Sequence, residues 1–223
     1  MRSTVYSSCA LPFLATAVGL KTAIILVVAP AMMANVAVMW SAGYFRETLH
    51  KFSRFYVSTI PGICIGILSL SAIDQKVAAI VLGIIIVIYS GFSAYRPVLH
   101  LPERFHLLLQ FPAGLLNGFF TGLTGSQVLP LLPYMLSINL EPDRFVQAVN
   151  MAVTISAAIM IIVLMASGIM DLPGLGMSVL CIAPAMAGIA LGTRVRRFIP
   201  ATQFRTVVLG VLAVIGFVLI IGR

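Results

Sequence analysis

The densest group of polar residues inside an apolar stretch of the sequence lies at residues 117–127, which read NGFFTGLTGSQ. Pro130 and Pro133 follow it. Polar side chains within a hydrophobic segment need partners, and a hydrated substrate cavity would supply them. Gly118 and Gly122 are four residues apart, so both lie on one helix face where another helix can approach closely. Such packing does not account for the polar side chains of the segment. These are Asn117, Thr121, Thr124, Ser126 and Gln127.

The chemistry of this segment is that of an anion site. The run Gly125-Ser126-Gln127 predicts a helix break, and a helix starting after it would have unpaired amides at its N-terminus, where anions bind. Two half-helices pointing inward, with hydroxyl groups and a carboxamide beside them, could hold a sulfonate, sulfite or carboxylate without any buried Arg or Lys.

Polar residues on the following helix could face the same cavity. Asn150 and Thr154 are four residues apart and share a helix face, with Ser156 close by. Pro30 and Asn35 occupy the corresponding part of the first half of the chain. Ordinary hydrogen bonding between helices explains these flanking residues equally well. The predicted substrate-binding residues are Asn117, Thr121, Gly122, Thr124, Gly125, Ser126, Gln127, Pro130, Asn150 and Thr154.

Catalytic and metal-binding groups are missing from the apolar segments. Their interiors contain no Asp, Glu, Lys or His, and Arg205 alone lies near the end of one. An intramembrane hydrolase would need paired acids, a serine with a base, or metal ligands. His50, His100 and His106 lie in basic loops, and residues 118–125 lack the lysine of a phosphate-binding loop. We therefore expect no catalytic residue, no metal site, no bound nucleotide and no cofactor.

The composition is that of a membrane protein. Hydrophobic residues make up 61% of the 223 residues, charged residues make up 9%, and the mean hydropathy is +1.11, whereas soluble domains are about half apolar and a quarter charged. The net charge of +8 does not indicate nucleic-acid binding, because Lys and Arg are confined to short segments between apolar runs. Cys9, Cys64 and Cys181 lie far apart and indicate no disulfide framework.

Long apolar segments recur along the whole chain. Because every backbone amide in lipid must be satisfied internally, these segments are predicted to be helices. Two shorter ones, 9–20 and 127–138, cannot span about 30 Å of hydrocarbon at 1.5 Å per residue and are predicted to be half-helices or re-entrant segments. The sequence thus predicts an all-α polytopic membrane protein with about seven transmembrane helices. The predicted spans are 22–43, 55–71, 77–94, 107–123, 146–168, 173–191 and 203–221.

The charges of the loops predict the topology. Loops 44–54, 95–106 and 192–205 are rich in Lys and Arg and should face the cytoplasm. Loops 72–76 and 169–172 are neutral or acidic and should face the other side.

Collinear sequence matches predict an internal repeat. The first half, 1–94, lacks a counterpart of the helix that opens the second half, 107–223, and 95–106 is the cytoplasmic linker between them. The matches are LPFL at 11–14 with LPLL at 129–132, PGICIGI at 61–67 with the small-residue run at 184–192, and VLG at 81–83 with VLG at 208–210.

The loop charges predict that the two halves have opposite orientations. A basic loop follows the span 22–43, whereas the equivalent loop 169–172 of the second half is acidic. This inverted repeat requires 107–138 to enter and leave the membrane on the same side, as a hairpin. A parallel arrangement of four plus four helices is the alternative.

The glycine motif is similar to that of a known family. Gly118, Gly122 and Gly125, leading into Pro130, resemble the sulfite exporter TauE/SafE family of membrane permeases. The small-residue helix around 184–192 and the duplicated unit are similar too, although the family often has more glycines where this chain has Ser126-Gln127. The resemblance implies a permease of the bacterial plasma membrane for sulfite, sulfonates or related organic anions.

Other functions stay open at this point. A membrane scaffold or regulatory subunit would use the polar cluster for packing alone, and an intramembrane enzyme is a further, weaker alternative. The predicted partners are a small anionic substrate and the lipid bilayer. The Gly-x-x-x-Gly face formed by Gly118 and Gly122 could equally serve a homodimer interface or internal packing.

Overall fold

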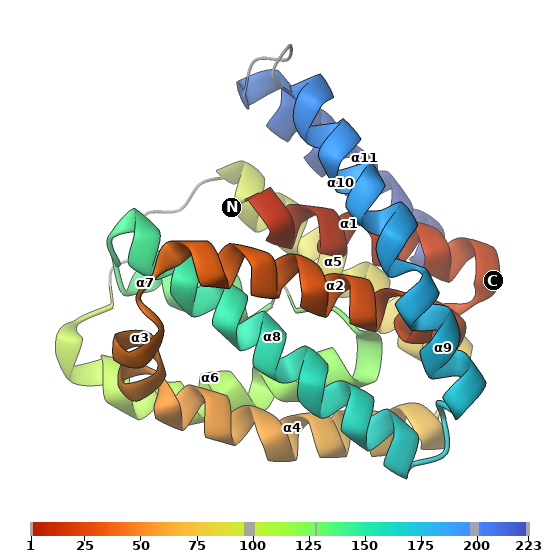
Figure 1. Cartoon of the computed structure of the whole chain (residues 1–223), viewed down its shortest axis with the longest axis horizontal. Coiled ribbons are helices and arrows are strands. Elements are labelled where there is room, and N and C mark those ends of the chain that lie inside the picture. Colours follow the sequence, from red (N-terminus) through yellow and green to blue (C-terminus); the bar gives the residue numbers. More distant parts are fainter. Residues whose placement is uncertain (1, 96–100, 128, 197–200, 222–223) are drawn as a thin grey trace.

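The computed structural model describes residues 2–95, 101–127, 129–196 and 201–221. The regular elements of this described part are α-helices (Figure 1). They are α1 (Arg2–Val18), α2 (Leu20–Ala42), α3 (Phe45–Lys51), α4 (Ser53–Ala72), α5 (Gln75–Tyr95), α6 (Glu103–Thr124), α7 (Leu131–Ser137), α8 (Pro142–Ala166), α9 (Leu172–Leu180), α10 (Ile182–Arg196) and α11 (Ala201–Ile221).

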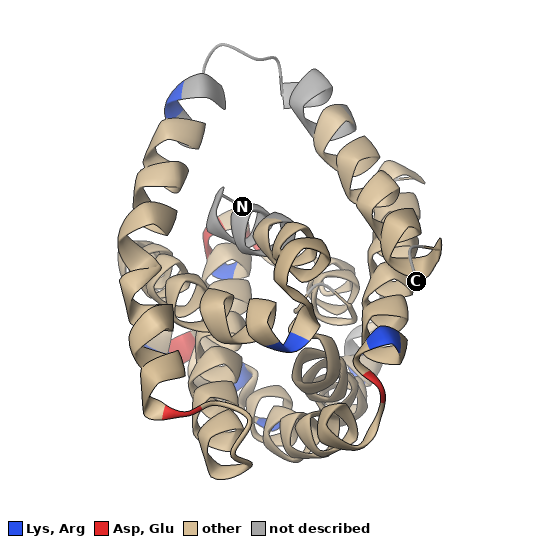
Figure 2. Ribbon diagram, turned by 90° about the vertical axis from the view of Figure 1, so that its right-hand side faces the viewer, with Lys and Arg blue, Asp and Glu red and all other residues tan. Residues whose placement is uncertain are grey.

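Within the described residues, six stretches of helix are long and apolar enough to cross a membrane. They are α2, α4, α5, most of α6, α8 and the joined stretch Leu172–Gly192 of α9 and α10. A shorter apolar helix, Val207–Ile221, lies within α11. These elements confirm the predicted membrane helices, and Figure 2 shows that long stretches of them carry no charged residue.

Two of the short segments differ from the prediction. Helix α1 extends over Arg2–Val18, whereas the sequence predicted a half-helix at 9–20, because residues 2–8 are mostly polar and give no hydropathy signal. Helix α7 is only Leu131–Ser137, shorter than the predicted 127–138, because Gln127, Leu129 and Pro130 are not helical.

Helices α4 and α6 lie side by side and run in the same direction, with Gly62 opposite Gly118 and Gly66 opposite Gly122. A Cβ atom added to Gly118 would lie 2.9 Å from the backbone nitrogen of Ile63, and one added to Gly122 would lie 2.5 Å from its carbonyl oxygen. These contacts are backbone against backbone, so no side chain can move to make room. Gly118 and Gly122 therefore serve internal packing rather than the alternative dimer interface.

Charged and polar contacts bring several helix ends together on the side of the molecule where α3 lies. Arg144, at the start of α8, makes an ion pair with Glu47 of α3 at 2.7 Å. Gln110 of α6 donates through Nε2 to the carbonyl oxygen of Lys51 at 2.9 Å. The basic loop 44–54 and the starts of α6 and α8 thus lie at one end of the bundle, whereas α9 lies at the other (Figure 1).

Helices α10 and α11 extend away from the rest of the bundle (Figure 1). Helix α11 packs on α5, whereas the residues of the stretch Leu172–Gly192 are exposed or half-buried except for Ser178. One buried contact fixes its first part, because Ser178 of α9 accepts a hydrogen bond from the backbone N–H of Ala29 in α2 at 3.2 Å. Residues 197–200 of the predicted loop 192–205 lie outside the described residues.

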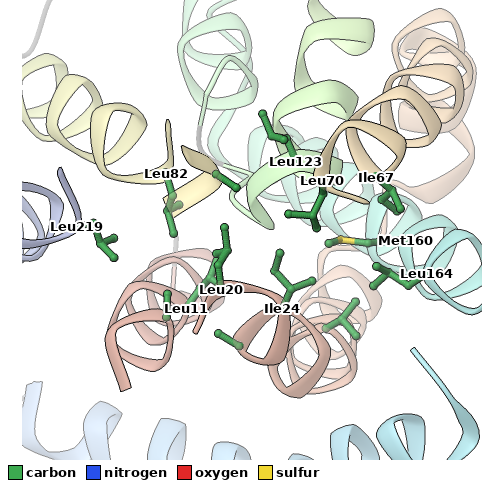
Figure 3. Close-up of a cluster of buried hydrophobic side chains, with 14 of the residues drawn as sticks. Leu11, Leu20, Ile24, Ile67, Leu70, Leu82, Leu123, Met160, Leu164 and Leu219 are labelled. Atoms are coloured by element: carbon green, nitrogen blue, oxygen red, sulfur yellow. The ribbon is translucent and has the colours of Figure 1, made fainter. Parts of the chain in front are cut away.

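Two apolar clusters form the core. The α3-side cluster consists of Phe52, Phe55, Tyr56, Leu131, Tyr134, Met135, Ile138, Ala148, Val149, Met151, Ala152 and Val153. The α9-side cluster is larger, and Figure 3 shows Leu20 and Ile24 of α2 gathered with Leu70, Leu123 and Met160 from α4, α6 and α8. Both clusters draw on α4 and α8, at different heights along these helices.

Candidate functional site

The candidate site is built on a hairpin made of α6, a non-helical segment and α7. The backbone N–H of Leu101, just before α6, donates to the carbonyl oxygen of Ser137 at the end of α7 at 3.0 Å. The hydroxyl of Tyr134 in α7 donates to the carbonyl oxygen of His106 in α6 at 3.0 Å. The chain therefore enters and leaves this hairpin at the same end of the bundle, as the sequence predicted for 107–138.

The turn of the hairpin begins at Gly125. This residue has φ +73° and caps the C-terminus of α6, with its N–H donating to the carbonyl oxygen of Thr121 at 2.8 Å. A Cβ atom here would lie 2.8 Å from Cγ1 of Ile24 in α2. The left-handed backbone and the close contact both require glycine. The predicted helix break at 125–127 is thus confirmed.

Hydroxyl groups hold the turn together. The hydroxyl of Thr124 accepts from the backbone N–H of Ser126 at 3.2 Å, and the hydroxyl of Thr121 donates to the carbonyl oxygen of Ser126 at 3.4 Å. Pro130 follows a cis peptide bond and precedes the first residue of α7. Irregular backbone at membrane depth is tolerated only where protein buries it or where it lines a water-filled cavity.

Buried polar residues lie at a similar depth on four helices, and we call this set the polar layer. At 1.5 Å per residue, Asn35 lies about 10 Å from the end of α2 and Asn150 about 12 Å from the start of α8. Asn117 precedes Gly118, which lies against Gly62, and Gly62 is about 14 Å from the start of α4. Those three ends share one side of the molecule. The polar layer consists of Asn35, Ser58, Thr59, Asn117 and Asn150.

The polar layer lies near the boundary between the two apolar clusters. On α4, Phe55 belongs to the α3-side cluster and Ile63 to the α9-side cluster, with Ser58 and Thr59 between them. On α6, Ala113 packs on the α3-side cluster and Leu123 belongs to the α9-side cluster, with Asn117 between them. A polar layer between two apolar seals is the arrangement expected of a substrate site closed from both sides.

Several buried polar atoms have no hydrogen-bond partner among the described residues. Asn117 and Gln147 are fully buried, and both the nitrogen and the oxygen of each carboxamide are unpartnered. The carboxamide oxygen of Gln127 and the hydroxyl of Ser156 are unpartnered too. Each such group costs about 1–3 kcal/mol of stability. Water or a bound anion would satisfy these groups.

The carboxamides of Asn35 and Asn150 have matching environments. Asn35 donates through Nδ2 to the carbonyl oxygen of Ala31 at 2.6 Å, and Asn150 donates to that of Val146 at 2.7 Å. Each bond reaches back four residues along its own helix. The surrounding sequences also match, with NVAV at 35–38 and NMAV at 150–153. This similarity between the two segments is visible in the sequence alone.

The structure brings some of the predicted site residues together. Thr121, Thr124, Gly125 and Ser126 contact one another in the turn of the hairpin. Asn117 lies on the same α6 face as Thr121, four residues earlier. Asn150 and Thr154 are joined by a hydrogen bond from the hydroxyl of Thr154 to the carbonyl oxygen of Asn150 at 2.8 Å.

The site in the structure differs from the predicted set of residues at two positions. Gly122 faces α4, and the close contact with that helix accounts for its being glycine. Gln147 was missing from the predicted set, although its sequence position could have indicated it. It lies three residues before Asn150 and seven before Thr154, so the three polar residues share one face of α8.

The comparisons with known proteins agree with this architecture. Residues 6–219 match the family model described as sulfite exporter TauE/SafE. Searches of curated proteins and of solved structures found no match. The matched residues cover both clusters, the hairpin and the polar layer. Members of this family are membrane transporters rather than enzymes. The chain therefore belongs to the sulfite exporter TauE/SafE family, whose members carry anions such as sulfite across membranes.

Proposed function

We propose that this protein is a permease of the bacterial plasma membrane that moves sulfite, or a related sulfonate or organic anion, through the polar layer. The fully buried and unpartnered carboxamide of Asn117, beside the broken hairpin, is the observation that carries this proposal. Family membership over residues 6–219 supports the class of substrate.

The chemistry of the layer suits an oxyanion. A carboxamide nitrogen offers two N–H donors, whereas the hydroxyls of Ser58 and Thr59 already donate to the carbonyl oxygen of Phe55. The oxygens of sulfite, a sulfonate or a carboxylate are all acceptors. The carboxamides of the polar layer therefore provide neutral N–H donors on α2, α6 and α8 at a similar depth, as expected where an anion is bound without a buried cation. Charged side chains are confined to the ends of the described helices.

The inverted repeat is part of this proposal, and two observations support it. First, helices at equivalent positions of the two halves pack on each other, since α2 packs on α8 and α5 packs on α11. Second, α2 and α8 run in opposite directions, because Glu47 beyond the end of α2 makes an ion pair with Arg144 at the start of α8. Opening one apolar cluster while the other stays closed would expose the polar layer to each side in turn.

Export of sulfite from loaded cells tests the proposal. Cells that express the protein should lose sulfite faster than vector controls, and Gln127→Ala should abolish the difference at an equal amount of folded protein in the membrane. Gly122→Ala is the matched comparison, because its added methyl group collides with the α4 backbone and should lower the folded amount.

A scaffold role predicts a different pattern. If both substitutions lower the folded amount, and if neither changes export per amount of folded protein, the polar cluster serves packing alone. Export equal to that of vector cells at high expression would refute the proposed substrate class.

A further inference from the structure

Two carboxamides of the site have neither their nitrogen nor their oxygen hydrogen-bonded, and this limits the kind of anion that fits them. In both Asn117 and Gln147, the donor nitrogen and the acceptor oxygen lack partners in the described part of the chain. Helices α6 and α8, which carry them, are in contact. A ligand that satisfies these groups must offer acceptor oxygens to the nitrogens and at least one donor hydrogen to the oxygens.

A fully deprotonated dianion offers acceptors only. It would leave both carboxamide oxygens without a donor and would place its own charge beside them. A singly protonated oxyanion offers both kinds of group, because its O–H can donate to a carboxamide oxygen while its remaining oxygens accept from the nitrogens. This pairing is the same two-point exchange that carboxamides make with each other.

The charge of the surroundings favours the same species. No Asp, Glu, Lys, Arg or His occurs in the sequence between residues 107 and 140 or between 145 and 170, the stretches that hold Asn117 and Gln147. The cost of moving an ion out of water rises with the square of its charge, so a dianion costs about four times as much as a monoanion of equal size. Neutral dipoles offset a single charge more readily than a double one.

On the basis of the proposed function, we propose that the transported species is the singly charged, protonated form of a sulfite-type oxyanion, bound by the carboxamides of Asn117 and Gln147. The substrate then brings its own proton, and the site needs no titratable side chain to handle one. Sulfite loses its second proton near neutral pH, so both forms are available in solution.

The groups that could impose their own pH dependence lie mostly at the helix ends. His106 is the histidine closest to the hairpin, and its Nε2 lies 2.8 Å from the carbonyl oxygen of Leu101. Among the side chains that the structure describes, the remaining titratable or charged groups on the elements packed around the site are Lys21, Arg46, Glu47, His50, Lys51, Arg54, Tyr56, Cys64, Arg104, Tyr134, Asp143 and Arg144.

Sulfite efflux from proteoliposomes tests this inference, with equal pH inside and outside and with efflux from protein-free liposomes subtracted. The efflux rate is measured at one pH unit below and one pH unit above the second pKa of sulfurous acid. Between these two pH values the fraction of sulfite present as the monoanion falls about tenfold. At subsaturating total sulfite, we expect the rate to fall about tenfold with it. A rate that stays constant or rises with pH would overturn the inference while leaving sulfite transport in place.

Variants separate the substrate from the protein as the source of the pH profile. His50→Gln and His106→Gln should keep the wild-type profile, and a flattened profile in either would assign the pH dependence to that histidine and overturn the inference. Gln147→Leu should lower efflux at every pH at an unchanged folded amount, and unchanged efflux would remove Gln147 from the site. Sulfate, a dianion throughout this range, should not compete. The absence of sulfite efflux at any pH refutes the proposed function itself.

Discussion

Replacement of Asn117 by leucine separates a substrate site from a structural role, because the two predict opposite changes in stability. The Asn117 carboxamide is fully buried, and neither of its polar atoms has a partner in the described residues. Removing a buried group of this kind removes a penalty of about 1–3 kcal/mol. Leucine keeps the branching at Cγ and replaces the carboxamide by an apolar group at a fully buried position.

The expected result is a loss of transport without a loss of stability. We expect the free energy of unfolding of Asn117→Leu to be unchanged or raised by up to about 3 kcal/mol. In a chain of this size, each kcal/mol corresponds to about 2–4 °C in the melting midpoint. Asn117→Ala is the paired smaller variant, because the larger methyl groups of leucine cost about 1–3 kcal/mol where a packed site cannot expand.

Gln110→Leu is the matched control on the same helix. Its carboxamide is also buried, but its nitrogen donates to the carbonyl oxygen of Lys51 at 2.9 Å. Its oxygen is unpartnered, as in Asn117. Both leucine variants therefore remove an unpartnered oxygen, and only Gln110→Leu also removes a hydrogen-bonded nitrogen, so Gln110→Leu should be less stable than Asn117→Leu by about 1–3 kcal/mol. Thermal unfolding in detergent, read beside sulfite efflux, makes the comparison. If both Asn117 variants lower the melting midpoint as Gln110→Leu does, or if either transports sulfite at the wild-type rate, the reasoning is wrong.

Two further predictions concern packing. Gly118→Ala should destabilise the protein by about 1–3 kcal/mol, because the new methyl group meets the backbone of Thr59 and Ile63. Gly91 has open space around it, so Gly91→Ala should be neutral or stabilising by up to about 1 kcal/mol in the same unfolding assay. Ser178→Ala should cost about 0.5–1.5 kcal/mol, the net contribution of one hydrogen bond, because the bond between α9 and the backbone N–H of Ala29 in α2 is lost. The control is Ser71→Ala, which removes an exposed hydroxyl that donates to its own helix and should change stability by less than about 0.5 kcal/mol. Equal effects of Ser178→Ala and Ser71→Ala would show that α9 is not held through the bond to Ala29.

Much of the membrane fold followed from the sequence. Hydropathy decides which segments leave water, and that property belongs to the segment itself, so the long spans agree with the structure within a few residues. The break at Gly125 was also visible, because a positive φ needs glycine and the polar run after it cannot continue an apolar helix. The hairpin was predicted from loop charge, which the positive-inside rule converts into sidedness.

The tertiary structure alone decided which helix meets which. The glycines at 118 and 122 predicted a close helix contact, but only the fold showed that the partner is α4 and that the contact lies within the molecule. It also showed that Gln147 and Asn117 are buried without partners, while Gln110 on the same helix as Asn117 has one. The physical reason is that partition between lipid and water depends on each segment's own composition, whereas the satisfaction of a polar group depends on atoms brought from distant parts of the chain.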